Sequence, residues 1–231
     1  MTFISRRDLL KRAAAIGGAA ALAGSAEAPP SAEALRSTEA VALQREPLEN
    51  LTAAEADILD AVVARLIPTD ANGPGATEAR AAHYIDRALG GALAPSRQAY
   101  TTGLAALDRY ARSSRGKAFT ELTAADQDAL LVEVEAGTAS GFNGSAAFFG
   151  LVLSHTLQGT FGDPYYGGNA SFVGWDLIAY PGIRTMVTAA EQQSLEKKDL
   201  KPNHKSAYDY ESFTKATAQN LSRRSPHKEG A

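Results

Sequence analysis

The fold is decided by a stretch that reads Ser145-Ala146-Ala147-Phe148-Phe149-Gly150-Leu151-Val152-Leu153-Ser154-His155-Thr156-Leu157-Gln158. Apolar side chains occupy nearly every face of a helix drawn over these residues, and almost none is left for solvent. A helix of this kind lies inside a bundle, surrounded by others. The sequence therefore predicts a buried central helix over Ser145–Gln158, ended by the glycine at position 159.

A second strong helical pattern begins at Leu51. Thr52 and Glu55 have the spacing of a capping box, and apolar residues recur at intervals of four until Pro68 stops the run. A turn-forming cluster follows at residues 69–75. Similar patterns predict three further helices: Ala76 to Leu89, Pro95 to about Ser113, and one that opens at Thr123.

Strand patterns are nearly absent, because alternating β-branched and aromatic residues occur only in short stretches such as Ser171 to Val173. We therefore expect an all-α fold: a single helical-bundle domain of five or six helices over residues 51–190, with a loop rich in glycine and aromatic residues. An extended polar, basic tail is expected over residues 191–231, where basic side chains outnumber acidic ones.

The composition excludes several classes of function. The formal net charge is −3, which argues against a nucleic-acid partner on electrostatic grounds, since phosphate binding requires a basic surface. The chain has no cysteine, so no disulfide stabilises it and no thiolate binds an iron–sulfur cluster or haem.

The first 28 residues have the features of an export signal. The Arg6-Arg7 pair precedes an apolar run from Ala13 to Gly24, which is too short to span a bilayer. The pair resembles the twin-arginine signal, which predicts export to the periplasm or to the periplasmic face of the inner membrane. Cleavage after either Ala26 or Ala28 fits the small residues there, and a flexible spacer is expected over residues 29–50.

Catalytic signatures are missing. The sequence contains no dinucleotide-binding fingerprint, Walker motif, nucleophile elbow or H-E-x-x-H pair. Neither His83 nor His155 has a second histidine or a carboxylate four residues away, which leaves a helix-based metal site without support. We therefore assign no catalytic, cofactor-binding or metal-binding residue to this chain.

The stretch after the central helix is the most informative part of the chain. Five glycines and one proline lie from Gly159 to Gly174, among aromatic residues. Because large aromatic side chains give much contact area at small entropic cost, this composition predicts a rigid, exposed recognition surface.

The same stretch resembles the gluconate 2-dehydrogenase subunit 3 family, and the resemblance covers roughly Leu51 to Gly182. The matching positions are His155, Gly159, Phe161, Asp163, Pro164, Tyr166, Gly167, Gly168, Asn169, Gly174, Trp175, Pro181 and Gly182. The resemblance implies a noncatalytic small subunit without a cofactor of its own. Its partner would be a large FAD-containing flavoprotein of the glucose–methanol–choline type, often joined by a multihaem cytochrome c. The small subunit's leader would export both, and membrane association would occur only through partners.

The resemblance also indicates a partner interface. Its candidate residues are His155, Phe161, Asp163, Pro164, Tyr166, Gly167, Gly168, Asn169 and Trp175. Several have simpler interpretations: His155 as a hydrogen-bonded core histidine, Asp163 as a turn or cap residue, and the two glycines as backbone positions closed to other residues. Trp175 fits the core and the interface equally well.

Two other functions stay open. The chain could be a stand-alone periplasmic metalloprotein that uses His155, Asp163 and His83, or a binding or scaffold protein without a dehydrogenase partner. The tail, with Tyr208-Asp209-Tyr210 and Phe213, could lie along an acidic partner surface, although a solvated extension is the more usual fate of such a composition.

Overall fold

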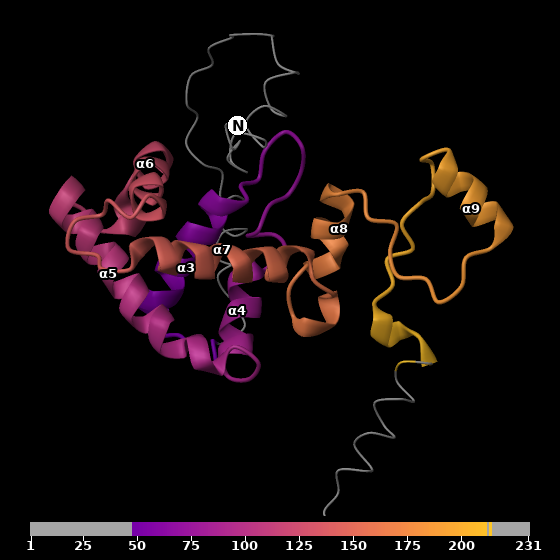
Figure 1. Ribbon diagram of the computed structural model, residues 1–231, viewed down its shortest axis with the longest axis horizontal. Helices are drawn as coiled ribbons and strands as arrows, with labels where there is room; N and C mark the ends of the chain where they lie inside the picture. The colour runs from indigo at the N-terminus through magenta and orange to yellow at the C-terminus, as the bar shows by residue number, and fades with distance from the viewer. Residues whose placement is uncertain (1–47, 212, 214–231) are drawn as a thin grey trace, which may run out of the picture. The chain divides into compact units, whose positions relative to one another are not determined.

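A computed structural model describes residues 48–211 and 213 (Figure 1). The α-helices in this part of the chain are α3 (Ala53–Leu66), α4 (Ala81–Leu89), α5 (Arg97–Arg115), α6 (Ala124–Glu135), α7 (Ser145–Phe161), α8 (Val173–Leu177) and α9 (Ala189–Glu196). The 3-10 turns are η1 (Ala94–Ser96), η2 (Phe119–Glu121), η3 (Pro164–Tyr166), η4 (Ala170–Phe172) and η5 (Ala207–Asp209). No strand occurs among the described residues, so the expected all-α class is confirmed.

The first helix, α3, begins and ends where the sequence predicts. The amide of Glu55 donates to Thr52 Oγ1 at 3.3 Å, and the Glu55 carboxylate accepts from the Thr52 amide at 2.8 Å. These bonds satisfy amides that have no partner inside the helix. The last helical residue is Leu66, two residues before Pro68.

The second helix is shorter than predicted. We expected it to begin at Ala76, but α4 begins at Ala81. The amide of Ala76 donates instead to the carbonyl of Ile67 at 2.8 Å, which holds the connecting segment against the end of α3. Arg80 then adopts a left-handed backbone conformation, with φ at 58°, and this breaks helical continuity.

A buried carboxylate holds the segment that leads into α3. Asp86 of α4 has no exposed surface, and its oxygens accept from the amides of Glu49 at 2.8 Å, Asn50 at 3.0 Å and Leu51 at 2.7 Å. Three backbone amides that donate to one carboxylate form strong, charge-assisted hydrogen bonds. The last residues of the predicted spacer are therefore fixed to α4, while residues 29–47, like the predicted leader with Arg6 and Arg7, lie outside the described residues.

The middle helices follow the sequence closely. Pro95 lies in η1, and α5 runs from Arg97 until Gly116 takes a left-handed conformation with φ at 74°. The helix predicted to open at Thr123 is α6, and the Thr123 side chain caps it.

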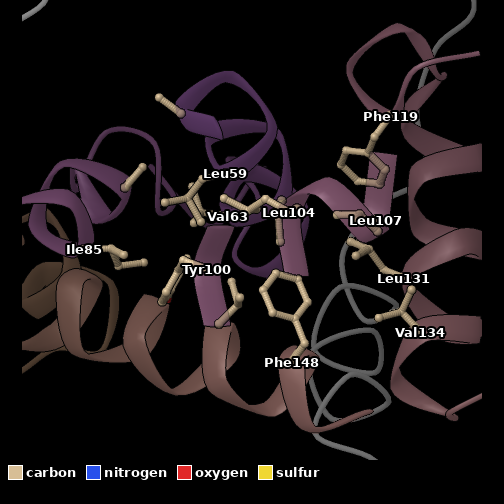
Figure 2. Close-up of a cluster of buried hydrophobic side chains, with 14 of the residues drawn as sticks. Leu59, Val63, Ile85, Tyr100, Leu104, Leu107, Phe119, Leu131, Val134 and Phe148 are labelled. Atoms are coloured by element: carbon tan, nitrogen blue, oxygen red, sulfur yellow. The ribbon is translucent and has the colours of Figure 1, made fainter. Parts of the chain in front are cut away.

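The central position predicted for α7 is confirmed, since α7 packs against α3, α4, α5, α6 and α8 (Figure 1). Phe148 rises from α7 toward Leu104 of α5 in the core (Figure 2). A Cβ atom on Gly103 would lie 2.1 Å from the Phe148 ring, so the absence of a side chain lets α5 and α7 approach.

Two details of α7 differ from the prediction. The helix has a solvent face, because Gly150, Ser154 and Gln158 are exposed. It also continues to Phe161 instead of ending at Gly159, because Gly159 is buried against Ala81 and Tyr84 of α4. That glycine serves close packing between α4 and α7.

Candidate functional site

The candidate site is the loop of residues 162–182 that follows α7. Its centre is Asn169, which has no exposed surface. The Asn169 amide donates to the Gly159 carbonyl at 2.6 Å and its side-chain Nδ2 donates to the Gly162 carbonyl at 2.9 Å. Its Oδ1 accepts from the Gly174 amide at 2.8 Å. The buried side chain thus joins Gly162, at the start of the loop, to Gly174, and the backbone amide holds Asn169 against α7, in agreement with the rule that buried polar groups are hydrogen-bonded.

The structure explains why glycine occupies three positions of the loop. Gly167 takes a left-handed conformation with φ at 95°, as expected of a position closed to other residues. Gly168 does not; a Cβ atom there would lie 2.2 Å from the Gly159 carbonyl oxygen. A Cβ atom on Gly174 would lie 1.8 Å from the Thr160 carbonyl oxygen. The loop lies against the backbone of α7 because two of its glycines have no side chain.

Trp175 belongs to the interior of the loop. It is 4% exposed, and its Nε1 donates to the carbonyl of Phe161 at 2.9 Å. The rings of Phe172 and Tyr180 lie 5.3 and 4.9 Å from the indole, centre to centre. Of the two interpretations of Trp175, the core position describes its environment in this chain.

Asp163 caps a turn and also binds the C-terminal part of the chain. Its Oδ1 accepts from the amide of Tyr165 at 2.9 Å, which caps η3 as the sequence suggested. The same oxygen accepts from the hydroxyl of Ser206 at 2.6 Å, and Oδ2 accepts from the amide of Ala207 at 2.9 Å. This carboxylate therefore joins two segments that are distant in sequence.

The C-terminal segment, defined here as residues 201–210, packs along the loop. His204 Nε2 lies 2.7 Å from Asp176 Oδ1, and the His204 ring stacks on Phe172 with centres 5.1 Å apart. Asn203 and Tyr210 both donate to the Ile183 carbonyl, each at 2.6 Å. The sequence predicts a tail that is solvated or lies on a partner; the structure shows that residues 201–210 of it also contact their own chain.

His155 is a hydrogen-bonded core histidine, which is the simpler of the interpretations given for it above. It is 6% exposed, its Nδ1 lies 3.0 Å from the hydroxyl of Tyr100, and the two rings stack with centres 5.8 Å apart. Burial lowers the pKa of the His155 imidazole from its ordinary value of 6.5. The ring joins α7 to α5.

The alternative metal site finds no geometric support in residues 48–211 and 213. No group of three or more His, Cys, Asp or Glu side chains in that range could hold a metal ion. His155 contacts Tyr100, and Asp163 binds Ser206 and Ala207. Within the same range, no helix has the length and apolar character needed to cross a membrane.

Exposure divides the nine candidate interface residues. His155, Gly168, Asn169 and Trp175 are buried, and four others are half-buried: Phe161, Asp163, Pro164 and Gly167. Tyr166 alone of the nine is exposed, at 51%. Contacts between any of them and a partner stay a prediction.

The structure brings together two tyrosines, one from the aromatic loop and one from the tail. Tyr165 is 54% exposed beside Tyr166, and the ring of Tyr208 stacks on Tyr165 with centres 3.7 Å apart. The double tyrosine is visible in the sequence, whereas the stacking of Tyr208 depends on the fold of the C-terminal segment.

Comparison with protein families decides the identity of this helical domain. The family model described as gluconate 2-dehydrogenase subunit 3 matches residues 53–182, which is more than half of the chain. The chain belongs to the gluconate 2-dehydrogenase subunit 3 family. The match begins at the first residue of α3 and ends at Gly182 in the loop, so this family domain includes Asn169 and Asp163 but not the C-terminal segment. No curated protein and no solved structure gave a match to the chain.

Proposed function

We propose that this chain is the noncatalytic small subunit of an exported, FAD-dependent dehydrogenase complex that oxidises a sugar, a sugar acid or a polyol. The observation that carries the proposal is the family match over residues 53–182, because the family is named for a subunit of a dehydrogenase. The large subunit would be a flavoprotein of the glucose–methanol–choline type that holds the FAD. A multihaem cytochrome c would accept the electrons in complexes that contain one.

The chemistry of the loop supports a structural role. Asn169 uses its side-chain amide on the Gly162 carbonyl and the Gly174 amide, and the Asp163 carboxylate is bonded to Ser206 and Ala207. Polar groups that are fully engaged within the chain stabilise a shape and are poorly placed to bind a reacting molecule. A preformed loop of this kind suits assembly with another subunit.

Export is the second part of the proposal. The Arg6-Arg7 pair and the short apolar run after it would direct the chain to the twin-arginine pathway, which transports folded proteins. This route suits a partner that must bind its FAD in the cytoplasm before transport. The leader of the small subunit would therefore carry the loaded large subunit with it into the periplasm.

The test is recovery of the complex from the host bacterium. The full chain with a C-terminal affinity tag is isolated from the periplasmic fraction, and the co-purifying polypeptides are identified by mass spectrometry. We expect one large subunit with stoichiometric FAD and a sugar or polyol dehydrogenase activity. Recovery of the chain alone, with turnover or a prosthetic group of its own, contradicts the proposal.

Export is tested by a leader variant. Arg6→Lys with Arg7→Lys should retain both the chain and the flavoprotein in the cytoplasm, and the periplasm should lose its dehydrogenase activity. The matched control is Arg12→Lys, a change of the same kind outside the pair, which should leave export intact. If the flavoprotein reaches the periplasm with the double variant, the co-export role is wrong.

A further inference from the structure

The loop and the C-terminal segment together build an exposed aromatic surface. We call Tyr165, Tyr166, Tyr208 and Arg87 the tyrosine surface. Tyr165 and Tyr166 are 54% and 51% exposed. Exposed large aromatic side chains that gather in one place are typical of interaction sites.

The tyrosine surface is ordered before any partner binds. Tyr165 and Tyr166 lie in the η3 turn, which is capped by Asp163 and closed by the left-handed Gly167. The ring of Tyr208 stacks on Tyr165 at 3.7 Å, and the hydroxyls of Tyr166 and Tyr208 are 2.9 Å apart. Side chains that are already fixed lose little conformational entropy on binding.

Its chemistry is mixed. The three rings offer apolar faces, and the Tyr165 hydroxyl has no hydrogen-bond partner among the residues that the structure describes. The two hydroxyls of Tyr166 and Tyr208 share one hydrogen bond, which leaves one proton to donate elsewhere. The surface therefore suits a partner that brings both apolar groups and hydrogen-bond acceptors.

A cation borders the rings. Arg87 is exposed on α4, and its guanidinium lies at Gly167, where a Cβ atom would be 3.4 Å from Nη1. Within the described part of the chain Arg87 has no carboxylate partner. An arginine that is free to pair next to exposed tyrosines has the composition of a binding hot spot.

We propose that the tyrosine surface is where the large dehydrogenase subunit docks, through a patch of apolar side chains with a carboxylate opposite Arg87. This inference rests on the proposed function and adds the location and the charge of the contact. The guanidinium, which pairs with no carboxylate of residues 48–211 and 213, selects an acidic partner patch, and the phenol hydroxyls select acceptor groups within it. The surface also depends on Tyr208, which lies outside the family match.

The first measurement uses the unmodified proteins. The wild-type complex and the isolated full chain are labelled with hydroxyl radicals, and the labelling of each tyrosine is read by mass spectrometry. We expect Tyr165 and Tyr166 to lose most of their labelling in the complex, whereas Tyr180, which is also exposed, should change little. Equal labelling of Tyr165 and Tyr166 in both samples overturns the proposal.

The second measurement is the affinity of variants for the purified large subunit. Tyr165→Ala and Arg87→Glu should each raise the Kd about tenfold or more. The Arg87→Glu variant should also weaken the dependence of association on salt, because the attraction that salt screens is lost. Val132→Ala and Lys117→Glu, at exposed positions of α6 and of the connection before it, are the matched controls and should bind like the wild type.

The outcomes separate the two proposals. A wild-type chain that does not bind the large subunit contradicts the proposed function, and the docking surface falls with it. A wild-type complex in which the Tyr165→Ala and Arg87→Glu variants bind normally overturns the docking surface alone. A surface that is occupied by a second copy of this chain, seen as a dimer that Tyr165→Ala dissolves, also overturns it.

Discussion

Asp163 and Ser206, 43 residues apart, are joined by a hydrogen bond of 2.6 Å from the serine hydroxyl to Oδ1 of the carboxylate. Asp163 lies in the family domain, whereas Ser206 lies beyond its matched end at residue 182. The same carboxylate caps the turn that holds Tyr165. The position of the C-terminal segment and the shape of the aromatic turn therefore depend on one side chain.

Asp163→Asn should loosen the C-terminal segment while the helices stay folded. The variant keeps the size of the side chain but loses its charge and one acceptor, and charge-assisted bonds are about twice as strong as neutral ones. Amides of residues 203–210 should exchange hydrogen about tenfold faster, a loss of about 1.4 kcal/mol in local stability. Hydrogen exchange read by mass spectrometry measures this.

The matched control for that variant is Asp199→Asn, at an exposed aspartate whose side chain contacts no other side chain in the described part of the chain. Its exchange pattern should equal that of the wild type. If Asp163→Asn leaves residues 203–210 as protected as before, the carboxylate does not hold the segment.

Gly174→Ala should destabilise the domain severely. The added methyl group would lie 1.8 Å from the Thr160 carbonyl oxygen, and a backbone atom cannot move aside as a flexible side chain can. We expect a loss of about 2 kcal/mol or more in the free energy of unfolding, since overpacking against fixed atoms costs that much. Urea unfolding followed by circular dichroism measures the change.

Gly150→Ala provides the opposite case within α7. A Cβ atom on Gly150 meets nothing within 4 Å, and alanine favours a helix interior over glycine. The same urea experiment should show a gain of about 0.5–1 kcal/mol. Equal effects at the two glycines would show that helix propensity, not close approach, sets the role of Gly174.

Tyr100→Phe should weaken the core without changing its shape. The variant removes the hydroxyl that lies 3.0 Å from His155 Nδ1 and leaves a buried ring nitrogen without a partner, at a cost of about 1–3 kcal/mol. Thermal unfolding measures the loss. Tyr84→Phe is the control, because its hydroxyl bonds to Gln158 at the surface and its removal should cost less than about 0.5 kcal/mol.

Stability should fall in mild acid because of His155. Burial lowers the pKa of this imidazole below 6.5, so the unfolded chain takes up a proton at a higher pH than the folded one. The contribution of His155 is complete at about pH 8 and declines as pH drops through about 6.5, until the folded form is also protonated. Urea unfolding between pH 8 and 5.5 follows this decline.

His155→Asn should flatten that dependence on pH, whatever its effect on stability at pH 8. His83→Asn is the matched control and should keep the decline of the wild type, because His83 is half-buried whereas His155 is buried. An unchanged pH profile in His155→Asn would assign the decline to another group.

The sequence predicts the helices well where the signals are local. Thr52 with Glu55, and Thr123 alone, mark helix starts because capping involves neighbours in the chain. Ala76–Leu89 is predicted too long because the bond from Ala76 to Ile67 and the left-handed Arg80 come from tertiary contacts. The prediction that Gly159 ends α7 is wrong for the same reason, because close packing against Ala81 explains the glycine at this position.

In the candidate site, too, local features can be predicted from the sequence, whereas contacts with distant segments cannot. Asp163 as a cap follows from its position before a proline, whereas its bonds to Ser206 and Ala207 require the fold of a distant segment. Tyr165 belongs to the aromatic loop that the sequence predicts to be a recognition surface, but its stacking on Tyr208 has no local signal. The residues of the sequence motif stabilise the loop. The exposed surface consists of tyrosine side chains that the loop holds in place.

The buried Asp86 gives the domain a mechanical property. Tension applied at residue 48 is transmitted to the three amides that this carboxylate binds, and these must break before α3 can be pulled from α4. The load is thereby delivered to a side chain with no exposed surface, sheltered from the water molecules that would otherwise compete for its oxygens. When the chain is pulled from its N-terminal side, we therefore expect the folded domain to move as one body, without α3 unfolding first.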